Sequence, residues 1–113
     1  MSLLDRGKRQ YRSRLQIAAE IIELAKNGSR KTRIMYLGNL SFDLLQRYLQ
    51  MLVNFGLIQR QDGDALTYVA TEKGLQFLEG YGELRKYSEL AETKKRELER
   101  SLTLMLEKNQ EAA

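Results

Sequence analysis

Gln46, Arg47 and Gln50 carry the most suggestive chemistry in this sequence. Amide and guanidinium groups form paired hydrogen bonds with guanine and adenine edges in the major groove of DNA. The surrounding residues show helical periodicity, which predicts that these three side chains share one outward face with Asp43 and Asn54. An ordinary solvated surface is the alternative, because Gln and Arg are also good formers of exposed helices.

Other kinds of chemistry are poorly represented. The 113 residues contain no cysteine and no histidine, which excludes disulfides, thiol nucleophiles, metal sites built on those ligands and the commonest general base. Neither a Gly-rich phosphate loop nor a G-x-S-x-G elbow is present. We therefore expect a protein that is not an enzyme, with no cofactor and no small-molecule substrate.

Charge is distributed unevenly along the chain. Residues 1–60 hold 11 Lys/Arg and 4 Asp/Glu, whereas residues 61–113 hold 8 and 11. The basic first part favours a polyanionic partner, although uneven surface solvation produces the same count. No apolar run has the length of a membrane span and the first residues lack a signal-peptide centre, so we expect a cytoplasmic protein with no membrane partner.

Two helices joined by a short turn are expected to present the polar face. Ser41 caps a helix that runs to about Phe55, and the preceding helix "KTRIMYL" is capped by Ser29 and stopped by Gly38-Asn39. This spacing predicts a helix-turn-helix, in which the first helix braces the second.

An earlier helix is expected to complete the core. Ser13 and Gln16 form a capping box at its start, and Asn27-Gly28 ends it. Its core-facing residues are expected to be Leu15, Ala18, Ile21, Ile22 and Ala25. Tyr36 and Tyr48 are also interpreted as core residues, whereas Tyr11 and Phe42 are left open for nucleic-acid contact.

A β-hairpin is predicted after the helix pair. Leu57-Ile58 opens an extended segment, Asp62-Gly63 supplies turn chemistry, and residues 67–69 are strand formers. Three helices followed by a hairpin is the order of a winged helix. The tip carries Asp62 and Asp64, which suits a phosphate backbone poorly, and Arg60 at the base of the wing compensates.

From Thr71 the pattern predicts one long helix with a heptad-like seam. The seam comprises Phe77, Tyr81, Leu84, Ser88, Ala91, Lys95, Leu98, Leu102 and Met105. A second copy of the helix is the simplest partner for it, and folding back onto the chain's own domain is the alternative. Gly80 and Gly82 are expected to mark a bend. We expect a flexible basic arm over 1–12, a DNA-binding domain over 13–79 and a dimerisation helix over 80–113.

The sequence resembles a known family. The stretches "NGSRKTRIMYLGNLSFDLLQRYLQML", "LIQRQ" and "TEKGLQFLE" are similar to the archaeal ten-kilodalton winged-helix proteins of the Sso-ten-a type. The resemblance covers about Ser13 to Met105 and is most specific at "KTRIMY". It differs from the family at Arg30, where proline is common, at the acidic wing tip and at the two glycines of the long helix.

This resemblance implies a mostly α fold with a small β-hairpin: a winged helix-turn-helix whose long C-terminal helix forms an antiparallel coiled-coil dimer. It also implies binding of double-stranded DNA, in chromatin organisation or transcriptional regulation at the nucleoid. It maps the recognition surface onto Phe42, Gln46, Arg47 and Gln50, and the basic start of the second helix onto Lys31 and Arg33.

The leading hypothesis is a homodimeric DNA-binding protein. Its expected DNA contacts are Arg9, Arg12, Arg14, Lys31, Arg33, Ser41, Phe42, Gln46, Arg47, Gln50 and Arg60. Its expected dimer contacts are Leu84, Tyr87, Ala91, Leu98, Leu102 and Met105. The competing hypothesis is a winged-helix adaptor that binds another protein, motivated by Asp43, Asp62 and Asp64; an RNA-binding protein would need an exposed aromatic platform that the sequence lacks.

Overall fold

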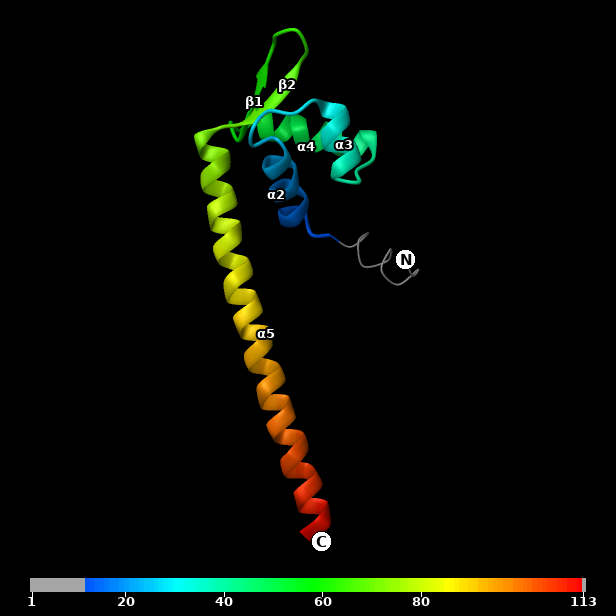
Figure 1. Ribbon diagram of the computed structural model, residues 1–113, viewed down its shortest axis with the longest axis vertical. Coiled ribbons are helices and arrows are strands. Elements are labelled where there is room, and N and C mark those ends of the chain that lie inside the picture. The colour runs from blue at the N-terminus through cyan, green and yellow to red at the C-terminus, as the bar shows by residue number, and fades with distance from the viewer. Residues whose placement is uncertain (1–11, 113) are drawn as a thin grey trace. The chain divides into compact units, whose positions relative to one another are not determined.

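The computed structural model describes residues 12–112 and confirms a mostly helical fold with a small hairpin (Figure 1). In chain order the elements of this part are α2 (Arg14–Leu24), α3 (Lys31–Leu37), α4 (Phe42–Asn54), β1 (Ile58–Gln61), β2 (Thr67–Ala70) and α5 (Glu72–Ala112). The chain divides into two compact units between Tyr81 and Gly82. The first unit has the element order of a winged helix.

The core of the first unit gathers one apolar face from each short element. Its largest fully buried side chains are Ile21, Ile22, Ile34, Leu45 and Ile58. Phe77 and Leu78 from the first turns of α5 pack against this cluster. Burial of these faces supplies the main driving force that holds the helices and the hairpin together.

Side-chain oxygens cap three helices as the sequence predicts. Ser13 precedes α2, Ser41 precedes α4 and Thr71 precedes α5, and each accepts a hydrogen bond from the amide three residues later at 3.1 or 3.2 Å. The reciprocal half of the predicted capping box, from the Ser13 amide to the Gln16 side chain, does not form. The side-chain nitrogen Nε2 of Gln16 donates to Oε1 of Glu20 at 3.3 Å.

The expectation that Ser29 caps α3 is wrong. Arg30 occupies the N-cap position, whereas Ser29 is buried and its backbone forms a bridge with Tyr68 in β2. The Ser29 hydroxyl donates to the Leu24 carbonyl at 2.6 Å and accepts from Arg33 at 2.7 Å. Ser29 therefore joins α2, α3 and the hairpin.

The helix ends use backbone conformations that the sequence favours. Gly28 has φ +89°, Asn39 has φ +52° and Gly56 has φ +80°, a region that glycine and asparagine tolerate best. Residues 25–27 form turns rather than helix, so α2 ends slightly before the predicted Asn27-Gly28 stop.

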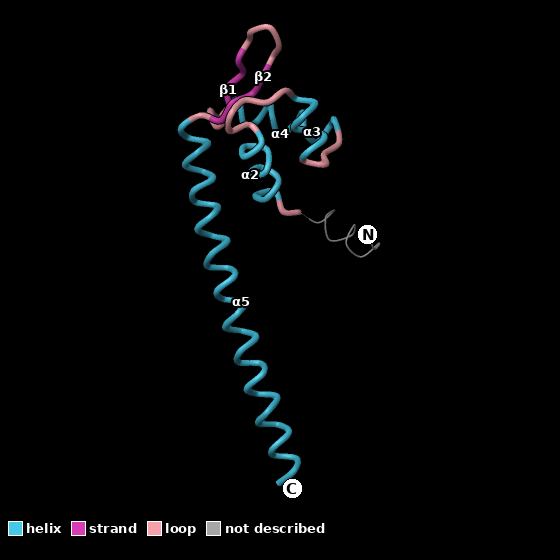
Figure 2. Tube along the Cα trace, viewed as in Figure 1, coloured by secondary structure: helices cyan, strands magenta, loops and turns pink. Residues whose placement is uncertain are grey.

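The hairpin forms where it is predicted, with a longer connection. β1 and β2, magenta in Figure 2, are antiparallel, with Ile58 opposite Ala70 and Gln61 opposite Thr67. This register leaves residues 62–66 as the loop, in place of a tight turn centred on Asp62-Gly63 alone.

Two residues expected in the core are exposed. Leu15 is 39% exposed, because it lies in the first turn of α2 and the buried face of that helix begins only at Ala18. Tyr36 is 84% exposed, because Ile34 is the residue that α3 directs into the core. The aromatic ring of Tyr36 therefore lies on the surface of the helix pair.

The long helix α5 continues through both glycines of the predicted bend. Residues 72–112 are helical, so neither Gly80 nor Gly82 ends the helix. Across residues 12–112, no helix combines the length and apolar content needed to cross a membrane.

Candidate nucleic-acid interface

The outward face of α4 carries the polar groups that the sequence places there. Gln46, Arg47 and Gln50 are exposed. On the opposite face the core residues are Leu45, Leu49 and Leu52. Helical periodicity thus separates a core-packing face from a face with amide and guanidinium groups.

Lys31 connects the start of α3 to this face. Its ammonium lies 4.0 Å from the centroid of the Phe42 ring, a distance at which the cation is attracted by the ring. The same ammonium donates a hydrogen bond to Oε1 of Gln46. Three of the predicted contact residues therefore form one cluster, and the Phe42 ring remains 59% exposed.

Arg60 lies where the hairpin meets α4. Together with Gln46, Gln50 and Asn54 it lines an open hollow, whose floor includes Tyr68. The expectation that the base of the wing contributes a cation beside the polar face of α4 is consistent with this placement. Asp62 and Asp64 are exposed in the adjoining loop.

Two predicted contact residues also have structural duties. The Ser41 hydroxyl caps α4 by accepting from the Leu44 amide. The Arg33 guanidinium donates to the Ser29 hydroxyl, which fixes one of its nitrogens and leaves the side chain exposed. Arg33 is thereby held close to the segment that pairs with β2.

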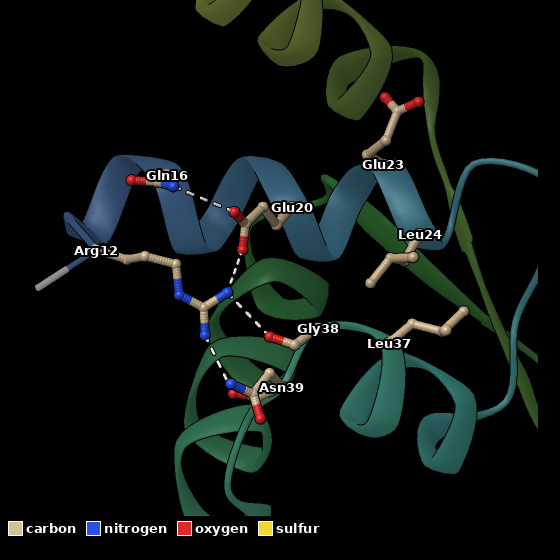
Figure 3. A pocket seen from close by; sticks show the side chains of 8 residues that line it. All are labelled: Arg12, Gln16, Glu20, Glu23, Leu24, Leu37, Gly38 and Asn39. Carbon is tan, nitrogen blue, oxygen red and sulfur yellow. Dashed lines mark hydrogen bonds and ion pairs between the residues drawn. The ribbon is translucent and has the colours of Figure 1, made fainter. Parts of the chain in front are cut away.

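Arg12 is the last residue of the predicted flexible basic arm, but its side chain packs against the folded unit (Figure 3). Its side chain is only 17% exposed and forms an ion pair with Glu20. The guanidinium also donates to the carbonyls of Gly38 at 2.9 Å and Asn39 at 3.1 Å. Because these three bonds hold its guanidinium against the protein, Arg12 is a brace between α2 and the turn of the helix pair.

Within the described residues, carboxylates do not neutralise the other cations of the predicted surface. Over residues 12–112, no ion pair involves Arg14, Lys31, Arg33, Arg47 or Arg60. Arg14 and Arg47 border a mainly apolar hollow between α2 and α4, lined by Leu15, Leu44, Tyr48 and Met51. The sequence pattern does not indicate this hollow, because it places Leu15 and Tyr48 in the core. The predicted contact Arg9 lies outside the described residues.

No cluster of acidic side chains in the described residues has the composition of a metal site. The exposed face of α4 offers hydrogen bonding by the amides of Gln46 and Gln50 and the guanidinium of Arg47. Such a surface suits the phosphates and base edges of a nucleic acid.

The second unit presents apolar side chains along α5. All six predicted dimer contacts, Leu84, Tyr87, Ala91, Leu98, Leu102 and Met105, are exposed in the single chain. Leu90, Leu104 and Leu106 are exposed as well, although they fall outside the heptad seam. Ion pairs between Arg85 and Glu89 and between Lys94 and Glu97 lie along the same helix.

Comparison with known proteins places the fold in a family. The model of a winged helix-turn-helix family matches residues 11–89, and the chain belongs to this family. The crystal structure of Sso10a-2, a DNA-binding protein from Sulfolobus solfataricus, matches with a TM-score of 0.71 at 24% identity, over 79% of this chain and 95% of that one. The resemblance to the Sso-ten-a type is thus confirmed for the fold.

Two further matches are weaker: one has a lower structural similarity, and the other covers a shorter part of the sequence. Lactococcus lactis ZitR matches with a TM-score of 0.53 at 19% identity, over 96% of this chain and 98% of that one. An uncharacterized protein of Methanocaldococcus jannaschii is 35% identical over 57 residues, which cover 50% of this chain and 59% of that protein. The match therefore spans little more than half of the archaeal relative.

Proposed function

We propose that this chain binds double-stranded DNA and is not an enzyme, with α4 entering or skirting the major groove. The exposed row of Gln46, Arg47 and Gln50, with Arg60 beside it, is the observation that carries the proposal. The description of Sso10a-2 as a DNA-binding protein supports the same role for this fold.

Phosphate contacts supply most of the affinity in this proposal. Arg14, Lys31 and Arg33 lie on the helices before α4, and their charges are not neutralised by ion pairs within residues 12–112. Each cation placed on a phosphate releases condensed counterions, which makes binding depend steeply on salt.

The active species in this proposal is a homodimer formed by α5. Leu98 is 64% exposed, Leu102 56% and Met105 65%, and covering such a stripe with a second copy of the same helix removes it from water. An antiparallel pair would carry two DNA-binding units. That arrangement suits a role in archaeal chromatin organisation or in transcriptional regulation.

Fluorescence anisotropy of a labelled random-sequence duplex, titrated at several salt concentrations, tests DNA binding. We expect log affinity to fall linearly with log salt, with a slope equivalent to several released counterions. Arg47→Ala is expected to weaken binding about tenfold without loss of fold. Arg100→Ala, at another exposed arginine, in α5, should leave affinity nearly unchanged. Equal effects of the two substitutions would contradict the assigned surface.

The competing function is a winged-helix adaptor that binds another protein. The acidic residues Asp62 and Asp64 on the loop of the hairpin favour it, because they would repel a phosphate backbone. Absence of binding to duplex DNA at low salt would favour the adaptor, since DNA alone is sufficient only for the first function.

A further inference from the structure

A hydrogen bond between Lys31 and Gln46 holds one end of the Gln46 side-chain amide. Lys31 is the first residue of α3 and Gln46 lies in the second turn of α4. The Lys31 ammonium donates to Oε1 of Gln46, and the Phe42 ring, 4.0 Å from the ammonium, helps to hold the lysine in place. The amide oxygen is therefore engaged within the protein.

The nitrogen of the same amide remains available. Within residues 12–112, no hydrogen bond uses Nε2 of Gln46, and the side chain is exposed. A free glutamine offers one donor and one acceptor, which is the pattern that pairs with N6 and N7 of adenine. One lone pair of the Gln46 oxygen accepts from the Lys31 ammonium, and the adjacent positive charge makes the other lone pair a weaker acceptor, whereas both N–H groups of Nε2 are free to donate.

The ammonium adds a second donor next to the first. Lys31 has three N–H groups, and one of them is used by Gln46. The pair thus presents an amide donor beside an ammonium donor on one surface. Guanine is the base whose major-groove edge offers two neighbouring acceptors, O6 and N7.

We propose that Lys31 is a positioning residue that sets the base preference of Gln46, turning it from adenine toward guanine. This inference rests on the proposed function, because it requires α4 to reach the major groove. It assigns to Lys31 a task beyond neutralising a phosphate.

The free protein provides the first test, which needs no DNA. The side-chain amide resonances of Gln46 in a ¹H–¹⁵N spectrum are expected to shift in Lys31→Met, which keeps an unbranched side chain of similar length and removes the donor. Lys26→Met, which removes a charge from an exposed lysine in the turn after α2, is expected to leave them in place. Unchanged Gln46 resonances in Lys31→Met would overturn the proposal, whatever the protein does with DNA.

Selection of duplexes from a randomised pool provides the second test. The wild-type protein is expected to enrich guanine at one position of its site, and Lys31→Met is expected to lower the guanine-over-adenine preference there about tenfold. Lys31→Arg, which keeps charge and donors, should restore much of the preference, and Lys26→Met should retain it.

The outcomes separate this inference from the proposed function. Uniformly weaker binding of Lys31→Met with an unaltered base preference would overturn the inference, because Lys31 would then act only on phosphate. Binding by the wild type with no base preference would also overturn it while leaving DNA binding intact. No binding of any duplex by the wild type would refute the proposed function itself.

Discussion

Gly74 is expected to be the least replaceable glycine in the described part of the chain. It lies in the first turn of α5, and a Cβ atom at this position would lie 2.2 Å from the carbonyl oxygen of Leu57 and 3.4 Å from Cγ2 of Ile22. The Leu57 carbonyl is not free to move aside, because it accepts the Thr71 amide at 3.1 Å. Gly74→Ala must therefore displace the start of α5 from Leu57, the residue before β1.

The size of the effect follows from two opposing contributions. Overpacking typically costs up to about 3 kcal/mol, and contact with backbone places this case at the upper end. Alanine recovers about 1 kcal/mol through its better helix propensity, so the net loss is about 2 kcal/mol. For a unit of this size, that loss lowers the melting temperature by roughly 8–16 °C.

Gly80→Ala is the matched control, since it makes the same change in the same helix. A Cβ atom at Gly80 would meet nothing within 4 Å, so the free energy of unfolding should rise by about 0.5–1 kcal/mol. Urea unfolding followed by near-ultraviolet circular dichroism, which reports on packed tyrosines such as Tyr68, measures both variants. Equal stabilities of Gly74→Ala and Gly80→Ala would refute the close approach of α5 to Leu57.

Two further substitutions test the brace and the seam. Arg12→Met should lower the free energy of unfolding, measured by thermal denaturation, by about 1.5–3 kcal/mol. It removes the ion pair with Glu20 and two hydrogen bonds to backbone carbonyls. The control Arg14→Met, at an exposed residue, should change the free energy of unfolding by less than about 0.5 kcal/mol. Leu98→Lys, in the seam, should convert the proposed dimer to a monomer, which light scattering measures as a halved mass. Leu90→Lys, at a residue 67% exposed outside the seam, should remain dimeric. The same mass for both variants would count against the seam.

Local signals in the sequence were sufficient for the order and type of the elements. Ser13, Ser41 and Thr71 each stand before an apolar repeat of helical period, and all three cap helices in the structure. The polar face of α4 was predictable for the same reason, because its periodicity alone separates Gln46 and Gln50 from the buried leucines.

Contacts between distant segments were not predictable in this way. Ser29 has the composition of a helix cap, but its pairing with Tyr68 in β2 overrides that preference. Arg12 has the composition of a solvated arm, but it finds acceptors at Gly38 and Asn39, more than 25 positions away. Periodicity indicates which face of a helix is apolar, but it does not show whether a neighbouring element covers that face at Leu15 or Tyr36.

The candidate site shows the same division. The residue types at Phe42, Gln46 and Arg47 suggested nucleic-acid contact from the sequence. The hydrogen bond from Lys31 to Gln46 joins residues 15 positions apart, and its geometry depends on how α3 is set against α4. A helix pattern contains no information on that orientation.

The pairing of β2 with the segment after α2 bears on the conformational entropy that the hairpin would lose when a partner binds. Ser29 and Tyr68 exchange two backbone hydrogen bonds at 2.8 and 2.9 Å, and Ala70 donates to Ala25 at 2.9 Å. With β1 on its other side, β2 is bonded along both edges. The base of the hairpin is therefore immobilised during folding, so that a partner arriving at Arg60 would not bear the cost of ordering it. Amide hydrogens at Ser29, Tyr68 and Ala70 would accordingly exchange with solvent together, on opening of the whole unit.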